Sequence, residues 1–417
     1  FYTMFKKDQQ YYKFCLYGFL KNLRFFEVFL VLYFLDNGIS FFNIGLLYAV
    51  REVIINIFEI PSGIIADSLG RRRTMIIAFI LYIISFVIFY LSDGFAVLAL
   101  AMIMFGMGEA FRSGNHKAMI IDYLSVKGWS DQKVTYYGHT RSWSQLGSAL
   151  SALLGGAIVF ITGQYRYIFL FSIIPYILDL VIVASYPAFL DKHHHALRRG
   201  DILEEFKKVL SEFWQAVKSL KVIKAIANLS FYSGYYKAMK DYLQPVIRSL
   251  AISLPILIYL DDEKRTSLLV GLIFFAIHLL TSFASRRSGP FSNRFRNITI
   301  PLNLTLFVGY GLGFLSGLAF WMTFYLVSVV LFAGVYVVEN LRKPIGVAYV
   351  SNSVEQRILA STLSTDSQVK SLSAAIIAPI IGIFADHFGI GIAIMVISLI
   401  MILVTPAYLA RSTNSKE

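Results

Sequence analysis

The sequence has little charge and almost no cysteine. Charged residues make up 15% of the 417 residues, and Cys15 is the single cysteine, so no disulfide can form within the chain. No phosphate-binding loop and no clear catalytic cluster is recognisable, which argues against an ATP-driven pump and against an enzyme. Hydrophobic residues reach 57%, more than a water-soluble fold can bury. We conclude that the chain is an integral membrane protein in contact with a lipid bilayer.

Long apolar runs recur along the whole chain. A helical span needs about 20 residues, which leaves room for about twelve spans with short loops. The net charge of +13 falls mainly in alternate loops, and this positive-inside pattern predicts two cytoplasmic termini rather than a nucleic-acid partner. The run after Lys13 is too long for a cleaved signal peptide. The predicted spans are 14–35, 41–63, 74–91, 95–124, 135–162, 167–189, 221–243, 267–285, 298–318, 320–350, 359–384 and 390–410.

The longest polar segment, residues 190–219, divides these spans into two sets. Residues 202–220 have the spacing of an amphipathic helix, which predicts a cytoplasmic linker between six-helix halves at 1–189 and 220–417. Three adjacent histidines at 193–195 lack the spacing and the acidic or thiolate partners of a metal site, so we expect no metal there.

A polar turn lies between the second and third spans, with the sequence Gly63-Ile-Ile-Ala-Asp67-Ser-Leu-Gly70-Arg71-Arg72-Arg73. This pattern strongly resembles the loop between helices 2 and 3 of the major facilitator superfamily, a group of secondary transporters. It departs at Ser68, where many members carry a basic residue. The resemblance implies an all-α fold of twelve transmembrane helices in two pseudo-symmetric halves, which alternate access to a central site.

The resemblance also implies a gate at this turn. In the family, the loop makes a charge relay with an acidic residue at the cytoplasmic end of helix 4, and the matching position is Asp122. Gly63 is expected to allow a neighbouring helix to approach, and Gly70 to permit the tight turn. The alternative is that the arginines only set topology. The residues of the predicted gating motif are Gly63, Asp67, Gly70, Arg71 and Asp122.

The fourth span is unusually polar. Glu109, Arg112 and His116 share one helix face, which cannot face lipid and must meet a water-filled cavity or partner charges. The alternative is a Glu109–Arg112 pair that only joins helices. The family's usual helix-4 arginine is absent, and Ser151-Ala152 replaces the Gly-Pro of the helix-5 antiporter motif. Both departures weaken the assignment of a drug antiporter.

Further charges lie inside other predicted spans. Glu339 and Arg342 repeat the Glu-x-x-Arg spacing of the fourth span, and Asp366 and Lys370 are spaced to satisfy each other. Helices that usually line the central site in the family carry Glu27, Glu109, Arg112, Lys237, Glu339 and Arg342. Expected nearer the cytoplasmic mouth are His116, Lys117, Arg141, Asp366, Gln368 and Lys370.

Together these patterns favour a secondary transporter of a small solute, monomeric and located in the cell membrane. We expect no cofactor beyond a coupling proton, for which Glu27, Glu109 and Glu339 are candidates because a carboxylate in low dielectric keeps its proton more readily. Positive charges slightly outnumber negative ones at the candidate site, which favours an anionic or zwitterionic substrate. Two alternatives stay open: a proton antiporter that exports lipophilic drugs, and a membrane receptor or lipid-modifying enzyme built on the same scaffold.

Overall fold

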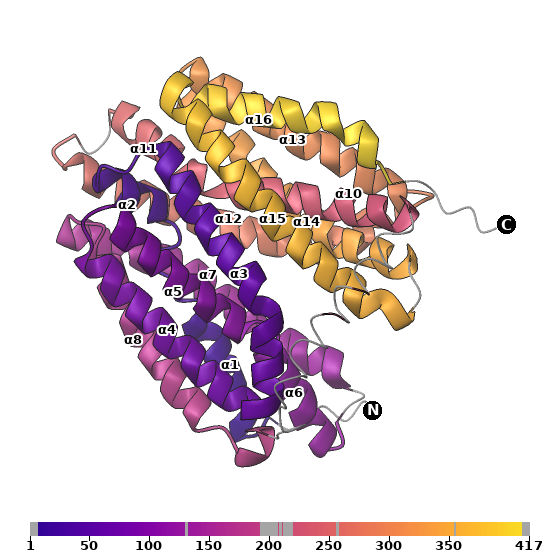
Figure 1. Ribbon diagram of the computed structural model, residues 1–417. Coiled ribbons are helices and arrows are strands. Elements are labelled where there is room, and N and C mark those ends of the chain that lie inside the picture. Colours follow the sequence, from indigo (N-terminus) through magenta and orange to yellow (C-terminus); the bar gives the residue numbers. More distant parts are fainter. Residues whose placement is uncertain are drawn as a thin grey trace. The chain divides into compact units, whose positions relative to one another are not determined.

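The computed structural model is all-α throughout the part of the chain that it describes (Figure 1). The described residues are 7–129, 132–191, 220–255, 258–353 and 356–410, together with residues 207 and 211. Most of the predicted linker at 190–219, with its amphipathic helix and three histidines, therefore lies outside the described residues. The all-helical membrane fold predicted from the sequence is confirmed.

The chain forms two compact units, and each takes one segment from the other half of the sequence. Unit 1 comprises Phe1–Tyr33, Ile54–Ile202 and Glu263–Phe275, and unit 2 comprises Phe34–Val53, Leu203–Asp262 and Ala276–Glu417. The predicted boundaries of the two halves, at 189 and 220, stay a prediction.

Unit 1 holds most of the helices from the first half of the chain. α4 packs against α5 and α8, and α1 packs against α7 and α8. The helices are α1 (Gln9–Lys21), the second part of α3 (Phe41–Leu69), α4 (Arg71–Leu91), α5 (Phe95–Arg112), α6 (Asn115–Val126), α7 (Lys133–Thr162), α8 (Tyr167–Ala184) and η2 (Ala188–Asp191).

Unit 2 holds the remaining helices. α13 packs against α14 and α16, and α10 packs against α14 and α15. The helices are the first part of α3, α10 (Leu220–Met239), η3 (Lys240–Tyr242), α11 (Leu243–Ser253), most of α12 (Asp262–Ser292), α13 (Thr299–Trp321), α14 (Tyr325–Ser353), α15 (Gln356–Phe388), α16 (Ile390–Val404) and η4 (Thr405–Tyr408). The boundary between the two units at Tyr33 and Phe34 falls within α2 (Leu30–Asp36).

The prediction of one continuous first span at 14–35 is wrong. α1 ends at Lys21, and α2 begins at Leu30. The Asn22 side chain donates to the Gly18 carbonyl oxygen at 2.6 Å, and the following turn uses bonds between residues three apart. Polar residues in this stretch compete with the helix for backbone partners, so the helix stops. Interrupted backbone at membrane depth is tolerated where it is buried in protein or lines a cavity.

The predicted fourth span at 95–124 agrees with a candidate membrane span at Phe95–Val126, but its helix is interrupted. α5 ends at Arg112, and α6 begins at Asn115. Between them Gly114 has φ 76° and ψ −35°, a left-handed conformation that glycine adopts without a steric penalty. The interruption places Arg112 at a helix end and exposes the first backbone N–H groups of α6.

Within the described residues, ten helical segments are long and apolar enough to cross a membrane, with the interrupted stretch Phe95–Val126 counted as one. Large apolar side chains such as Ile161, Leu272 and Leu403 are exposed on them, as expected of surfaces that meet lipid. The first and seventh predicted spans do not meet this criterion. They correspond to the interrupted α1–α2 and to α10, which carries Lys237 near its end. The predicted seventh span, 221–243, is shorter than expected because α10 gives way to η3.

Small residues on α7 let neighbouring backbones approach closely. A Cβ at Gly155 would lie 2.7 Å from the Phe25 carbonyl oxygen, and one at Gly156 would lie 2.8 Å from the Ser267 carbonyl oxygen. Such contacts are typical of packing between membrane helices. α7 is therefore held closely against the interrupted first span on one side and the first part of α12 on the other.

Candidate functional site

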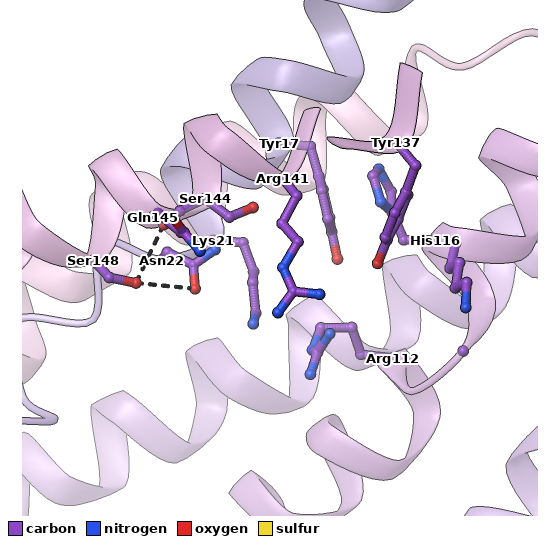
Figure 2. A pocket seen from close by; sticks show the side chains of 12 residues that line it. Tyr17, Lys21, Asn22, Arg112, His116, Tyr137, Arg141, Ser144, Gln145 and Ser148 are labelled. Atoms are coloured by element: carbon purple, nitrogen blue, oxygen red, sulfur yellow. Dashed lines mark hydrogen bonds between the residues drawn. The ribbon is translucent and has the colours of Figure 1, made fainter. Parts of the chain in front are cut away.

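A cavity of about 450 Å³ lies within unit 1 (Figure 2). Its walls come from α1, α7 and the junction between α5 and α6, so both interrupted spans contribute to it. This volume suits a small organic molecule. The lining residues are Tyr17, Lys21, Asn22, Arg112, Gly114, His116, Lys117, Tyr137, Arg141, Ser144, Gln145 and Ser148.

The cavity is strongly basic. Lys21, Arg112, Lys117 and Arg141 have basic side chains, and no carboxylate is among the twelve lining residues. Figure 2 shows the charged ends of Lys21, Arg112 and Arg141 directed into the same space from three different helices. Like charges gathered in a region of low dielectric repel one another, and a bound anion relieves that repulsion.

Glu109 lies beside the cavity and is bound by two arginines. Its carboxylate accepts hydrogen bonds from Arg24 and from Arg112, the latter at 2.7 Å. Arg112 also donates from Nε to the Tyr82 hydroxyl at 3.1 Å. The predicted Glu109–Arg112 pair is present, and Arg24 adds a second cation. Because one carboxylate is shared by two guanidinium groups, the cluster keeps a net positive charge while Arg112 is held in place.

His116 is held by aromatic rings at the edge of the cavity. Its ring stacks on Tyr17 with centroids 3.6 Å apart and an interplanar angle of 17°, and Phe14 meets it edge-on. Its Nε2 lies 3.2 Å from the Tyr186 hydroxyl. Neighbouring Lys117 lies over the Tyr137 ring at 5.7 Å. These contacts fix the first turn of α6 against α1 and α7.

The predicted gating residues meet in unit 1. Arg71 binds Asp122 at 2.5 Å and lies 3.8 Å from Asp67. The geometry that a charge relay needs is therefore present, and the gating role itself stays a prediction. At Gly63, no described atom beyond its chain neighbours and its own helix backbone lies within 4 Å of the place where a Cβ would stand, so the close helix approach expected there stays a prediction. The turn at Gly70 has φ 96°, which explains glycine there.

Asp191 completes this turn, although the sequence patterns did not single it out. It is buried, it accepts a hydrogen bond from the Arg72 backbone N–H, and it lies 3.5 Å and 3.6 Å from the Arg72 and Arg73 side chains. Arg72 also donates to the Tyr186 carbonyl oxygen at 2.9 Å. Arg72 and Arg73 therefore connect the start of α4 to η2. This structural contact is additional to the role in membrane topology that the sequence suggests for them.

Lys237 belongs to an ion cluster in unit 2. It binds Glu52, which Arg51 also binds at 3.0 Å, and it donates to the Ser371 hydroxyl at 3.3 Å. Glu52 is 1% exposed, so its charge depends on these two cations. Two cations on one buried carboxylate give unit 2 the same local arrangement that Glu109 has in unit 1.

Arg342 does not occupy the cavity-lining position that the sequence predicted. Its side chain is fully buried in unit 2 and donates to the Leu302 and Asn228 carbonyl oxygens, each at 2.5 Å, and to the Asn228 side chain. Its guanidinium also lies over the Tyr232 ring. The expected Glu339–Arg342 pair is absent from the described contacts, because Arg342 turns toward α10 and α13 instead. The repeat of Glu-x-x-Arg in sequence is therefore not a repeat of the ion pair.

The other predicted site residues of unit 2 also lie outside the cavity described above. Glu339 is buried; one carboxylate oxygen accepts from the Ser233 hydroxyl at 2.8 Å, and the other has no hydrogen-bond partner among the described residues. Asp366 accepts from the Ser230 hydroxyl at 2.6 Å, and its expected ion pair with Lys370 does not form in the described structure. Gln368 and Lys370 are half-buried on α15.

In unit 1, Glu27 lies in the break between α1 and α2, outside the cavity lining. Arg112, predicted at the central site, lines the same cavity as His116, Lys117 and Arg141, which were predicted nearer the cytoplasmic mouth. The prediction did not include Lys21 or Asn22, which also line the cavity. The signal for both was the cluster of polar residues that interrupts an apolar run, which is a recognised sign of a transporter site.

Comparison with known proteins agrees with this fold. The family model described as "Major Facilitator Superfamily" matches residues 15–368. The "Uncharacterized MFS-type transporter YxaM" of Bacillus subtilis (strain 168) is 21% identical over 377 residues, which is 89% of this chain and 88% of that protein. The "Quinolone resistance protein NorA" of Staphylococcus aureus (strain Mu50 / ATCC 700699) is 26% identical over 159 residues, which is 37% of this chain and 39% of that protein.

Among solved structures, a point mutant of the nucleoside transporter NupG superposes with a TM-score of 0.72 at 15% identity, covering 96% of this chain and 97% of that chain. This likeness shows the fold. With the family match over most of the sequence, it establishes that the chain belongs to the Major Facilitator Superfamily and is a multi-pass membrane transporter rather than an enzyme.

Proposed function

We propose that this transporter moves a small anionic solute, which binds in the cavity of unit 1, and that a proton is the coupling ion. The observation that carries the proposal is the composition of the cavity wall: four cationic side chains and no carboxylate among the lining residues. A cationic solute would meet uncompensated repulsion there. A zwitterion would find partners for its acid group and no lining carboxylate for its ammonium group.

The neutral part of the wall is also suited to an anion with polar substituents. Asn22, Ser144, Gln145 and Ser148 offer side-chain hydrogen bonds, and the tyrosines Tyr17 and Tyr137 offer rings. The first turn of α6 adds the positive end of a helix, with Gly114, His116 and Lys117 in the wall. These groups favour a small organic anion with hydroxyl or carbonyl groups.

Export of lipophilic compounds is the second candidate, because one relative of this chain is named for quinolone resistance. The similarity covers 37% of the chain. The high density of positive charge in the cavity argues against lipophilic cations as substrates. Lipophilic anions stay open, and the experiment below distinguishes them from polar anions.

The experiment uses the full chain in proteoliposomes and sets of probes that are matched in size. One set is gluconate, sorbitol and glucosamine; the other is benzoate, benzyl alcohol and benzylammonium. We expect uptake or exchange of the anion in at least one set, stimulated by a pH gradient, and none of its cationic counterpart. Preferred transport of the cation in both sets would overturn the proposal.

Matched variants locate the site. Arg141→Gln removes a cation from the cavity, whereas Arg166→Gln removes one that pairs with exposed Asp93 outside it. We expect the first variant to raise the half-saturating anion concentration about tenfold, equivalent to about 1.4 kcal/mol, and the second to leave it unchanged. Equal effects in both variants would place the anion elsewhere.

A further inference from the structure

Asp179 is a buried carboxylate without a partner among the described residues. It lies on α8 in unit 1 and is 0% exposed, and neither of its carboxylate oxygens has a hydrogen-bond partner there. A carboxylate in this position is costly when charged, because neither water nor a donor stabilises the charge. Its charge must therefore be neutralised either by a proton or by a cation that comes close.

α1, which carries Lys21, packs against α8, and the Tyr176 hydroxyl, one helical turn before Asp179, donates to the Lys21 carbonyl oxygen at 3.3 Å. Lys21 and Arg112, both in the cavity lining, are the two cations close enough to interact electrostatically with Asp179. The other titratable groups around it are the tyrosines Tyr17, Tyr176 and Tyr186. α4 and α7 also pack against α8, but within the described chain neither adds a charged group that acts on Asp179. Asp179 therefore does not line the cavity, but its carboxylate interacts electrostatically with Lys21 and Arg112, which do.

The two cations differ in their own partners. Arg112 is held by Glu109 at 2.7 Å and by the Tyr82 hydroxyl at 3.1 Å. Lys21 makes no ion pair among the described residues, and its ammonium group reaches into the cavity (Figure 2). Lysine has a long flexible stem and a compact charge, so it can change partners more easily than a bidentate arginine. Lys21 is therefore the cation that can alternate between the cavity and Asp179.

The other buried carboxylates are less suited to carry a proton for this cavity. Glu109 is saturated by Arg24 and Arg112, which favour its charged form. Glu339 has one unpartnered oxygen in the described structure, but it lies in unit 2, outside the cavity lining. Among these three, Asp179 combines two unpartnered oxygens in the described structure with a position on α8 beside Lys21, which lines the cavity.

We propose that Asp179 is the proton-carrying residue of this transporter and that Lys21 connects it to the bound anion. The inference rests on the proposed anion site and adds to it the residue responsible for coupling. With Asp179 protonated, Lys21 stays in the cavity and contributes to anion binding. When the proton leaves to solvent, the Asp179 carboxylate attracts the Lys21 ammonium group, the positive charge of the cavity falls, and the anion dissociates. Proton and anion therefore bind together and leave together.

The first test compares Asp179→Asn with Asp93→Asn in proteoliposomes, using gluconate and benzoate as probes. Asparagine keeps the size of the side chain and cannot release a proton in this range. Asp93 is an exposed carboxylate, 80% accessible, and serves as the control. We expect Asp179→Asn to abolish accumulation driven by a pH gradient and to keep anion exchange, with a flattened pH dependence. Gradient-driven accumulation at the wild-type level with unchanged pH dependence would overturn the proposal.

The second test needs no transported solute and therefore separates this proposal from the proposed function. Infrared difference spectra of the purified protein, recorded between acidic and alkaline pH, report the carbonyl band of a protonated carboxylic acid. We expect one such band to be lost in Asp179→Asn and kept in Asp93→Asn and Lys21→Gln. If the band is lost in Asp179→Asn but no probe anion is transported by the wild type, the substrate class is wrong and the proton site stands. An unchanged band in Asp179→Asn refutes the proton site.

Lys21→Gln tests the connection. Removing the ammonium group weakens anion binding directly, and it also removes the partner that favours deprotonation of Asp179. We expect a higher half-saturating anion concentration, and an Asp179 band that persists to more alkaline pH than in the wild type. A normal pH dependence of that band in Lys21→Gln would show that Asp179 titrates without Lys21.

Discussion

Asp386, near the end of α15, accepts hydrogen bonds from the backbone N–H groups of Phe41 and Phe42 at 2.8 Å each, and so caps the first turn of α3. The two helices are far apart in sequence and both contacts lie within unit 2. Close backbone packing accompanies this cap, because a Cβ at Gly45 would lie 2.6 Å from the Pro379 Cα. A side chain of one helix thus satisfies the unpaired donors of another.

We predict that Asp386→Asn lowers the free energy of unfolding by about 1 kcal/mol, since an amide replaces only part of the charge-assisted cap. Thermal unfolding of the purified protein measures the change. Ser40→Ala is the comparison, because among the described residues Ser40 accepts a single, longer bond, from the Asn43 N–H at 3.3 Å. A larger loss in Ser40→Ala than in Asp386→Asn would show that α3 is capped locally rather than by α15.

The Arg71–Asp122 contact supports a second prediction. Asp122→Asn should reduce transport several-fold at equal protein level, whereas Asp67→Asn should have a smaller effect because Asp67 is 59% exposed and 3.8 Å from Arg71. Uptake in proteoliposomes, normalised to incorporated protein, measures both. Exchanging the charges in an Arg71→Asp/Asp122→Arg double variant should restore part of the activity. Wild-type transport in Asp122→Asn would leave the loop with a purely topological role.

Arg342 gives a third prediction, which separates structure from function. Arg342→Lys should lower the free energy of unfolding by on the order of 2–3 kcal/mol, because an ammonium group cannot reach the Leu302 and Asn228 carbonyl oxygens together. Chemical or thermal denaturation measures this loss. The half-saturating anion concentration of the folded fraction should stay unchanged, in contrast to Arg112→Lys. If Arg342→Lys changes the affinity for the anion without loss of stability, Arg342 contributes to substrate binding rather than to the structure of unit 2.

The predicted topology is tested by labelling single cysteines with a membrane-impermeant reagent, after replacement of the buried Cys15 by serine. From the distribution of loop charges we expect reaction from outside at one set of loops and protection at the other. The positions expected to react are Asn37, Gly94 and Lys264, and those expected to be protected are Ser68 and Gly128. The reverse pattern would place both termini outside.

Sequence patterns predicted contacts made by neighbouring residues and by a known motif. The Glu109–Arg112 pair followed from spacing along one helix, and the Arg71–Asp122 contact followed from the family resemblance. Arg24 and Glu109 are 85 positions apart in the sequence, so their pairing cannot be predicted from the spacing of residues along one helix. The same limit explains the error at Arg342, whose partners come from two other helices.

The position of Asp179 and the two helix interruptions can also be recognised in the sequence, although the patterns considered above did not include them. Asp179 is a single carboxylate in a very apolar segment, and intramembrane carboxylates are functional by default. The interruptions after Lys21 and Arg112 were also visible as polar or glycine-containing stretches inside apolar runs. The total length and hydropathy of each run predict a continuous span, whereas the backbone conformation depends on local competition for hydrogen bonds.

The interrupted first span has a consequence for how the protein is made. Its stretch from Lys21 to Glu27 places three charged residues at membrane depth, each costing about 3 kcal/mol on the scale of translocon insertion. α1 and α2, with 13 and 7 residues, are each too short to be among the ten candidate membrane spans of the described residues, whereas α3 and α4 are long and apolar enough. Arg24 lacks its carboxylate partner until the ribosome has reached Glu109. We therefore expect the first span to enter the bilayer late or with help from its successors, and the arginines after Gly70 to orient the nascent chain before the first helix is inserted.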